Sequence, residues 1–360
     1  MENQFKKIKI LFTIPNFDTA GSGKVLYDLA KGLNKNLFEV HIACSHSNGA
    51  FFKDVEMLGL TIHIIEVTCK PRPYFSILRR IKPFKNFIQK NKFDIVHSWH
   101  WSSDWTEILA TRLGGAKFVY TKKAMTWGNI HWKIKSYLSN FIITINEEMR
   151  NYFPYKKGQK LIPLGLDTNY YNPELFDKNK NIAFRIITVA NLVPVKGVEV
   201  LIEAIKELNN NTICLEIIGD DKTQYALTLK KYVNDLNLQN QISFLGKYND
   251  VRSFLAQSDL YVIPSLKEGM PMALVEAMSM AKPVLGSNIS GVNYVLKGFH
   301  ELLFEAKNVK ELSEKIDIMY NMSKYEREEL GGKLRTYCMN HFSYDKFIVE
   351  HEILYKKLVN

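Results

Sequence analysis

At 360 residues the chain is too long for one ordinary hydrophobic core and suits two domains of about 100 to 200 residues each. Its hydrophobic content of 46% indicates a folded protein, and the lack of any run of about 18 apolar residues argues against a membrane-spanning helix. The net charge of +11 is concentrated in residues 1–170, which carry 25 Lys and Arg against 13 Asp and Glu, but no recognised nucleic-acid-binding module accompanies it.

The N-terminal residues lead directly into a strand-like run and lack the apolar core of a signal peptide, so we expect a cytoplasmic protein. The four cysteines are widely separated and none forms a C-x-x-C pair, which favours reduced, buried thiols over disulfides or a metal site. No Asp-x-Asp sequence occurs, so we expect no acidic metal clamp.

Apolar strand-like runs alternate with helical patterns through the first half of the chain. This alternation predicts a parallel, doubly wound α/β sheet with ligands at the carboxyl ends of its strands. The predicted strands are 8–14, 40–44, 62–67, 93–97, 117–120 and 141–145, and the predicted helices are 25–33 and 51–58.

The first predicted strand is followed by a loop of small residues, 15–24, that leads into a helix. Such a loop lets a phosphate or sugar approach the backbone, and Gly21 is the candidate contact. The pattern of a Walker loop is absent, and a plain tight turn is the alternative interpretation.

The densest positive charge lies in residues 70–92, where eight basic residues and no acidic one alternate with Phe, Ile and Leu. A basic amphipathic segment of this kind indicates contact with an anionic membrane surface. The alternative is a helix that packs on the core and leaves a basic face in solvent. The candidate membrane or acceptor patch is Arg79, Arg80, Lys82 and Lys85.

Polar and aromatic residues follow the fourth predicted strand, in the sequence His97-Ser-Trp-His100-Trp. Side chains at the carboxyl edge of a strand are candidates to touch a transferred group or an acceptor. We keep His97 and His100 as catalytic candidates without assigning a base. A packed structural histidine is the alternative for each.

A second alternation begins at residue 185 and predicts another Rossmann-like domain, and the Pro and Gly of 160–173 suit a linker before it. Two further helical patterns cover 309–322 and 344–358. The predicted strands are 186–190, 214–218, 242–245, 260–263 and 283–286, and the helices are 198–208, 224–236, 251–257 and 272–280.

Three strand ends of this second half carry candidate ligand contacts. Lys196 lies at a predicted strand-to-helix turn, where an ammonium can neutralise a diphosphate leaving group, although an exposed surface lysine is the alternative. Gly219 and the turn at Leu245 are candidates to seat a base and ribose.

The most informative stretch is Glu268-Gly-Met-Pro-Met-Ala-Leu-Val-Glu276. It joins a short apolar strand to a helical run, so backbone N–H groups and the positive end of a helix dipole meet at one spot, which suits a phosphate. Glu268 on the loop and Glu276 in the helix offer carboxylates that can accept from sugar and ribose hydroxyls. The alternative is the solvated start of a surface helix.

The full pattern Pro-Ser-x-x-Glu-Gly-x-Pro-x-x-Leu/Val-x-Glu-Ala-Met resembles the donor-binding signature of the retaining glycosyltransferases of family 4, which have the GT-B fold. The resemblance covers nearly the whole chain and is strongest from 186 to 291. It implies two Rossmann-like, doubly wound domains that face each other across a cleft. The implied domains are an acceptor-binding domain at 1–168, a nucleotide-sugar-binding domain at 169–340, and a last helix at 341–360 that crosses back to the first.

Family 4 chemistry implies retention of the anomeric configuration without a metal or other cofactor, with a nucleotide-diphosphate sugar as co-substrate. The resemblance places Glu268 beside the donor sugar, Glu276 on the ribose and Lys196 on the diphosphate. The donor-binding residues that it implies in this stretch are Glu268, Gly269, Met270, Pro271, Met272, Ala273, Leu274 and Glu276.

Several positions depart from the family pattern, among them Ala20 in the first loop and Leu164, which replaces an asparagine in the linker. Gly23 stands where relatives carry a carboxylate in the first loop, Trp99 stands in place of a histidine, and Asn191 stands in place of an arginine. Asn191 remains a candidate donor contact, but the leaving-group charge then rests more heavily on Lys196 and on backbone amides.

We therefore expect transfer of a hexose or N-acetylhexosamine from a nucleotide sugar, with UDP favoured, to a polysaccharide, lipopolysaccharide or lipid-linked acceptor at the inner face of a membrane. Two other classes with this fold stay open. A sugar-nucleotide 2-epimerase would turn over the donor without an acceptor, and a catalytically impaired scaffold subunit would bind nucleotide without transferring sugar. A dehydrogenase is disfavoured because no G-x-G-x-x-G follows a predicted strand.

Overall fold

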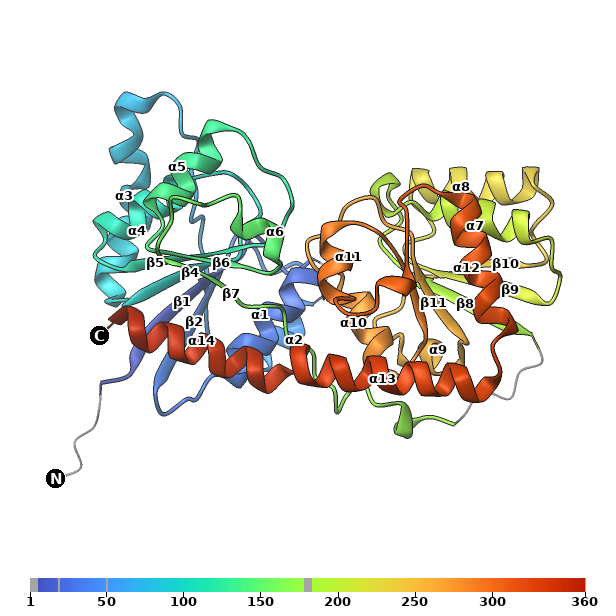
Figure 1. The fold of residues 1–360 in the computed structure, drawn as a ribbon. Coiled ribbons are helices and arrows are strands. Elements are labelled where there is room, and N and C mark those ends of the chain that lie inside the picture. Colours follow the sequence, from blue (N-terminus) through green and yellow to red (C-terminus); the bar gives the residue numbers. More distant parts are fainter. Residues whose placement is uncertain (1–5, 19, 50, 178–182, 360) are drawn as a thin grey trace. The chain divides into compact units, whose positions relative to one another are not determined.

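A computed structural model describes residues 6–359 except 19, 50 and 178–182 (Figure 1). The chain forms two compact units, one from Met1–Gly165 with Tyr344–Asn360 and the other from Leu166–Ser343. Each unit is built on one parallel sheet, which confirms the predicted doubly wound α/β class.

The first unit contains a seven-stranded sheet in the order β3-β2-β1-β4-β5-β6-β7, and all neighbouring strands are parallel. Its strands are β1 (Ile8–Thr13), β2 (Phe38–Cys44), β3 (Thr61–Ile64), β4 (Ile95–Ser98), β5 (Lys117–Lys122), β6 (Phe141–Thr144) and β7 (Gln159–Leu161). Its helices are α1 (Ala20–Gly32), α2 (Phe52–Glu56), η1 (Tyr74–Ser76), α3 (Ile77–Asn91), α4 (Thr106–Leu113), α5 (Ile130–Leu138), α6 (Glu147–Arg150) and α14 (Tyr344–Val359).

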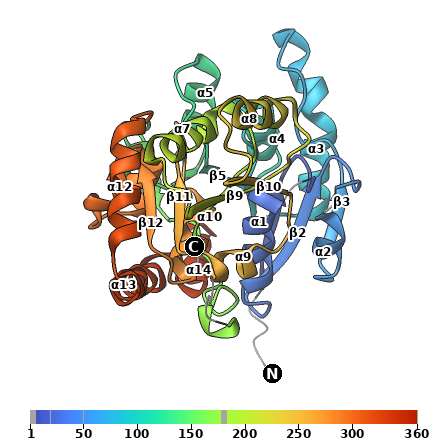
Figure 2. The same cartoon turned by 90° about the vertical axis from the view of Figure 1, so that its right-hand side faces the viewer.

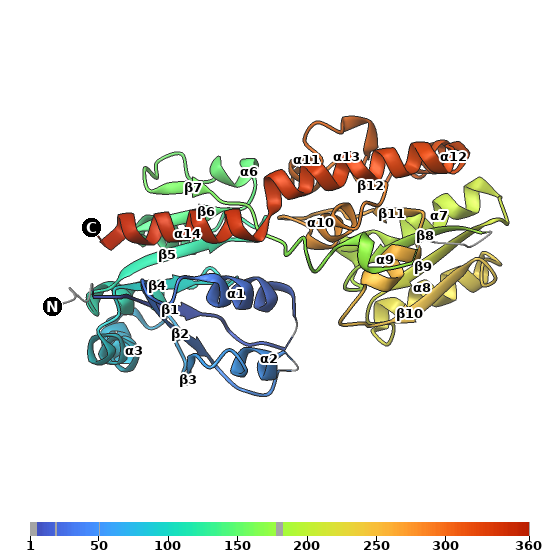
Figure 3. The same cartoon turned by 90° about the horizontal axis from the view of Figure 1, so that it is seen from below.

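Helices cover both faces of this sheet because successive side chains of a strand point to opposite sides. Leu11 of β1 lies in a buried cluster with Ile81 of α3 and Ile108 of α4. The next residue, Phe12, packs against Tyr355 of α14, with ring centroids 6.4 Å apart. Helices α3 and α14 therefore lie on opposite faces of the first sheet (Figure 3).

Helix α14 belongs to the first unit although it is the last element of the chain. Its buried residues recur along one stripe, which gives the helix an apolar face for β1 and α1. The Tyr344 hydroxyl donates to the Asp28 carbonyl in α1 at 2.9 Å. The residues of the buried stripe are Phe347, Ile348, His351, Leu354 and Tyr355.

The second unit contains a six-stranded parallel sheet in the order β10-β9-β8-β11-β12-β13, on which α7 and α12 pack side by side (Figure 2). Its strands are β8 (Phe184–Val189), β9 (Ile213–Ile218), β10 (Ile242–Gly246), β11 (Leu260–Ile263), β12 (Val284–Ser287) and β13 (Leu303–Phe304). Its helices are η2 (Pro173–Leu175), η3 (Pro194–Lys196), α7 (Val198–Leu208), α8 (Gln224–Asp235), α9 (Arg252–Gln257), α10 (Met272–Ser279), α11 (Ser290–Val295), η4 (His300–Leu302), α12 (Val309–Asn321) and α13 (Lys324–Phe342).

Most predicted elements are confirmed, but the predicted loop at 15–24 is wrong in its second half. Helix α1 already begins at Ala20, so Gly21 and Gly23 are helical. A Cβ on Gly23 would lie 3.0 Å from Cδ1 of Phe17, so a residue without a side chain lets Phe17 pack against the helix. Gly23 therefore marks close packing within a helix instead of an extended loop.

The prediction also missed helix α13, which is 19 residues long. Its sequence contains Gly331-Gly332, and glycine disfavours helix interiors by about 1 kcal/mol. A Cβ on Gly331 would lie 2.0 Å from the Ala281 carbonyl oxygen, so packing requires the residue that local propensity penalises. The helix begins with a capping box between Ser323 and Glu326, which offsets part of that penalty.

Candidate functional site

The second sheet reverses its strand order between β8 and β11, and the loops after these two strands meet. The Leu266 amide donates to the Val195 carbonyl at 2.8 Å, which joins the two loops. In parallel α/β sheets, ligands bind outside the carboxyl ends of the strands at such a reversal. The candidate site is therefore the set of loops around this point of the second unit.

Lys196 and Glu268 form an ion pair at the centre of these loops. The Lys196 ammonium donates to Oε1 of Glu268 at 2.6 Å, and the Ser265 hydroxyl donates to the same oxygen at 2.8 Å. The side chains of Lys196 and Glu268 are 22% and 12% exposed, so the pair is sheltered yet reachable. The Ser287 hydroxyl donates to the Ser265 carbonyl and fixes the end of β11 beneath the pair.

Two glycines let these loops approach one another. Gly197 has φ +59°, and a Cβ there would lie 2.3 Å from the Pro264 carbonyl oxygen. A Cβ on Gly291, in α11, would lie 2.5 Å from the Glu268 carbonyl oxygen. Neither contact leaves room for a side chain, and at Gly197 the positive φ disfavours other residues as well. The Lys-Gly turn and α11 thereby hold the Glu268 loop in place.

The start of α10 presents backbone amides beside this pair. Within the described part of the chain, the amides of Met272 and Ala273 have no acceptor, as expected for the first turn of a helix. The Met270 and Leu274 side chains are buried in the core, and the Leu274 amide donates to the Pro271 carbonyl at 3.1 Å. Pro271, which precedes the first helical residue, is buried as well. Within the predicted stretch 270–274, the amides of Met272 and Ala273 are therefore the ones that can donate to a ligand.

Glu276 is engaged by Tyr171, a residue that the sequence analysis did not single out. The Tyr171 hydroxyl forms a hydrogen bond with the Glu276 carboxylate, and burial together with that carboxylate raises the pKa of Tyr171 well above its usual range. The Tyr171 carbonyl accepts from Arg335 at 2.9 Å and from the Ser279 hydroxyl at 2.8 Å. The predicted ribose contact is therefore connected to the segment where the chain enters the second unit.

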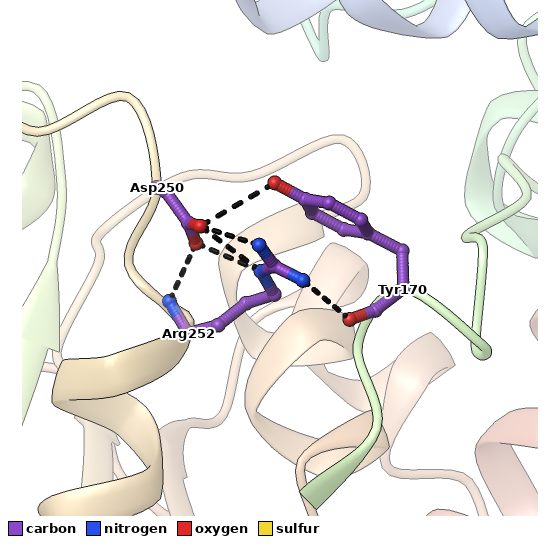
Figure 4. Close-up of polar contacts among 3 residues, drawn as sticks. All are labelled: Tyr170, Asp250 and Arg252. Carbon is purple, nitrogen blue, oxygen red and sulfur yellow. Dashed lines mark hydrogen bonds and ion pairs between the residues drawn. The ribbon is translucent and has the colours of Figure 1, made fainter. Parts of the chain in front are cut away.

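A second contact holds this entry segment. Arg252 makes paired hydrogen bonds to Asp250, from Nε to Oδ1 at 2.9 Å and from Nη2 to Oδ2 at 2.6 Å, and donates from Nη1 to the Tyr170 carbonyl at 3.1 Å (Figure 4). The Arg252 guanidinium lies 3.4 Å from the centroid of the Tyr170 ring. Tyr170 is 80 residues from Asp250 in sequence, so no local pattern could indicate this contact.

The other predicted donor contacts lie at neighbouring strand ends. Asn191 is exposed on the loop after β8, and Leu245 is half-buried near the end of β10. A Cβ on Gly219, after β9, would lie 2.2 Å from the Ala190 carbonyl oxygen. The order β10-β9-β8 places these three strand ends side by side.

The two candidate histidines lie in the first unit and differ in environment. His97 is fully buried, with Nδ1 2.7 Å from the Tyr355 hydroxyl and Nε2 2.7 Å from the Thr121 hydroxyl, and burial lowers its pKa well below the ordinary value. Both ring nitrogens are occupied, which fits the alternative of a structural histidine. His100 is 7% exposed, and burial lowers its pKa to about 3.

The structure divides the predicted basic patch. Arg79 and Lys82 are exposed on α3 and Lys85 is half-exposed, whereas Arg80 donates to the carbonyls of Pro71 and Pro73 at 3.1 and 2.8 Å. Arg80 therefore holds the turn before α3, while the opposite side of α3 packs into the core. Gly21 is exposed at the start of α1, and a Cβ there would meet no atom within 4 Å.

Among the described residues, no group of three or more His, Cys, Asp or Glu could hold a metal ion. In the same part of the chain, no helix is long and apolar enough to cross a membrane.

Two parallel Rossmann-like sheets, of seven and six strands, define the GT-B class of glycosyltransferase folds. The structure matches a glycosyltransferase from Rickettsia africae ESF-5 with a TM-score of 0.87 at 20% identity, over 99% of this chain and all of that one. It also matches Anabaena HepE, solved with UDP and glucose, with a TM-score of 0.80 at 18% identity, over 96% of this chain and 98% of that one.

The sequence matches two family descriptions, "Glycosyltransferase Family 4" over residues 19–170 and "Glycosyl transferases group 1" over residues 172–333. It is 27% identical to the capsular polysaccharide biosynthesis glycosyltransferase CapH of Staphylococcus aureus, over 88% of this chain and 94% of that protein. It is 25% identical to a UDP-Gal:alpha-D-GlcNAc-diphosphoundecaprenol alpha-1,3-galactosyltransferase of Escherichia coli, over 86% and 87%. The chain therefore belongs to the family 4 glycosyltransferases, as the motif at 268–276 indicated.

Proposed function

We propose that this glycosyltransferase moves a hexose or N-acetylhexosamine from a UDP-sugar to a polysaccharide or lipid-linked acceptor, with retention of configuration. The observation that carries the proposal is the convergence of the Lys196 ammonium, the Glu268 carboxylate and the first amides of α10 at one strand reversal. The choice of UDP and of the acceptor class is supported by the named activities of the Escherichia coli and Staphylococcus aureus relatives and by the UDP bound to HepE.

The proposed chemistry follows from where charge develops. When the bond between the anomeric carbon and the diphosphate breaks, negative charge grows on the departing oxygen. Lys196 and the amides of Met272 and Ala273 can stabilise that charge. The acceptor hydroxyl attacks from the same face and gives its proton to the leaving phosphate, so neither a metal nor an enzymic nucleophile is part of the proposal. Glu268 accepts from sugar hydroxyls, and Glu276 accepts from the ribose.

We propose further that α3 brings the first unit to an anionic membrane surface. Phe75 and Leu78 are 92% and 64% exposed at the start of the helix, next to the exposed cations Arg79 and Lys82. An apolar tip flanked by cations suits the headgroup region of a bilayer.

Vesicle flotation tests the membrane proposal. Reversal of Arg79, Lys82 and Lys85 to Glu should abolish binding to vesicles with acidic lipids, and Arg80 is left unchanged because it holds the preceding turn. The matched control reverses three exposed lysines of the second unit, Lys206, Lys231 and Lys310. Equal loss in both variants, or binding that salt does not weaken, contradicts a specific role for α3.

A panel of nucleotides tests the transferase site. UDP, GDP, ADP, CMP and their sugars are compared by thermal stabilisation of the wild type and Glu276→Ala. A ligand at about a hundred times its dissociation constant adds about 2.7 kcal/mol, and we expect this for the UDP series alone, reduced in the variant. Isomerisation of the UDP-sugar without any acceptor would favour the 2-epimerase, and binding without transfer would favour the scaffold subunit.

A further inference from the structure

The first sheet also reverses its strand order, between β1 and β4, and a group of charged residues lies at that point. Glu107 is buried there and accepts hydrogen bonds from the Thr13 hydroxyl, at the end of β1, and from the Ser98 hydroxyl, at the end of β4 (2.8 Å). Lys123 directly follows the neighbouring strand β5. The position is the one at which parallel sheets bind ligands.

Lys123 is a sheltered cation beside two tryptophan rings. Its ammonium donates to the Trp99 carbonyl at 2.5 Å and lies 5.1 and 5.8 Å from the ring centroids of Trp99 and Trp101. Within the described residues no carboxylate pairs with it. Burial, and then the nearby cation Lys135, lower the pKa of Lys123 to about 7. A sheltered ammonium that uses one of its three donors is costly unless an anion completes its environment.

The neighbouring groups leave this cation unbalanced. Lys135 donates to the Ser102 carbonyl at 3.0 Å and interacts with the carboxylates of Glu107 and Asp104. Asp104 is itself used by Thr106, whose amide and hydroxyl donate to it at 2.8 and 2.6 Å. The carboxylates of Glu107 and Asp104 therefore interact with Lys135 and Thr106, and neither forms an ion pair with Lys123 among the described contacts.

His100 supplies a second unsatisfied group at the same place. Its side chain is 93% buried, and within the described part of the chain Nε2 has no hydrogen-bond partner. Lys123 donates to the carbonyl of Trp99, the residue before His100, so His100 lies in the same group. Lys123 and Lys135 also act on His100 electrostatically. A neutral imidazole carries one N–H, so His100 can donate to a bound oxygen when that proton is on Nε2.

We propose that Lys123 and His100 bind a phosphoryl group of the acceptor at the strand reversal of the first sheet. The inference rests on the proposed function for the identity of the molecule, while the site itself rests on the unpaired ammonium and imidazole. A phosphoryl oxygen would accept from both groups and provide the missing counter-ion. Such a group can come from a lipid-linked diphosphate or from a soluble sugar phosphate, and the chemistry at Lys123 is the same.

Tryptophan fluorescence can test this site separately from the donor site. All five tryptophans, Trp99, Trp101, Trp105, Trp127 and Trp132, lie in the first unit, and two of them flank Lys123. The experiment titrates inorganic pyrophosphate into the full chain and follows the emission. Farnesyl diphosphate and glucose 1-phosphate are the two further arms, and they distinguish a lipid-linked from a soluble source.

We expect saturable binding that Lys123→Gln weakens at least about tenfold, since a hydrogen bond to a charged group contributes about 1.5 to 3 kcal/mol. Lys123→Arg keeps the cation and should remain within about threefold of the wild type. Lys117→Gln, at the opposite end of the same strand, is the matched control and should not change the titration.

Equal binding by the wild type and Lys123→Gln, or no binding of any of the three probes, would overturn the proposal. The proposed function is tested independently by UDP, so the two failures are distinguishable. If UDP stabilises the protein but phosphate binding does not depend on Lys123, only the proposal of the acceptor site is overturned. If phosphate binding depends on Lys123 but UDP does not stabilise the protein, only the proposal of a UDP-sugar donor is overturned.

Discussion

Replacement of Lys196 by Met should lower the turnover of a UDP-sugar far more than it lowers the stability of the second unit. The substitution keeps the aliphatic stem and removes the ammonium, which lies 2.6 Å from Glu268. Glu268 retains the Ser265 hydroxyl as a donor at 2.8 Å, so its carboxylate is not left without a partner. Glu268→Gln is the complementary change, because it keeps the shape and removes the negative charge.

The effect on turnover should be larger than the effect on stability, because only turnover depends on negative charge that develops during the reaction. The pair is partly exposed and Glu268 keeps one hydrogen bond, so the free energy of unfolding should fall by about 1 to 2 kcal/mol. Removal of one donor from a developing anion costs about 3 to 4 kcal/mol, which lowers kcat about 100- to 1000-fold. The coupling between Lys196→Met and Glu268→Gln in unfolding should be about 1 to 2 kcal/mol.

The rate of UDP release from UDP-glucose and UDP-N-acetylglucosamine measures kcat. Urea unfolding followed by far-UV circular dichroism measures the free energy of unfolding. Tryptophan fluorescence reports the unfolding of the first unit separately, because all the tryptophans lie there. Lys206→Met, at an exposed position of α7, is the matched control. A fall in kcat below about threefold in Lys196→Met would refute the assignment of Lys196 to the leaving group. A coupling under about 0.5 kcal/mol would show that the ion pair contributes nothing in solution.

Three further predictions concern single positions. Gly197→Ala should destabilise the second unit by about 2 to 4 kcal/mol in urea unfolding, because its φ is +59° and a Cβ would lie 2.3 Å from a carbonyl oxygen; a loss under about 1 kcal/mol contradicts that packing. Tyr171→Phe should tighten UDP binding about fivefold in calorimetry, since the ribose no longer competes for Glu276, and weaker binding would show that the tyrosine instead orients the carboxylate. Burial lowers the pKa of His351 to about 4, so its stabilisation is complete above pH 6.5 and is lost as the pH falls towards 4. Between pH 7.5 and 5 this histidine should cost the first unit about 2 kcal/mol in fluorescence-monitored unfolding, and an equal pH dependence in His351→Gln contradicts the assignment.

Much of the fold could be predicted because parallel strands and amphipathic helices carry their own patterns. The helix predicted at 198–208 and the strand predicted at 260–263 agree with α7 and β11 to the residue. The family signature at 268–276 correctly indicated the glycosyltransferase family. The same motif predicted that Glu268 lies on a strand-to-helix turn and that Glu276 lies in the helix. Both predictions depend only on residues close in sequence, and Glu276 lies in α10.

Tertiary structure alone decided which side chains contact one another. Lys196 and Glu268 are 72 residues apart, and Tyr171 and Glu276 are 105 apart, so no local pattern pairs them. In the sequence Lys123 is one basic residue among many. Only the structure shows that it is sheltered and that no carboxylate among the described residues pairs with it.

Helix α13 shows that tertiary packing can also override the local preference of a sequence. Local propensity argues against a helix through Gly331-Gly332, yet the close approach of Gly331 to Ala281 requires a residue without a side chain. The sequence by itself therefore determined the elements whose residues repeat with a regular period and the motif that defines the family. The pairing of charges and the need for each close glycine depend on contacts between distant segments, which exist only once the chain has folded.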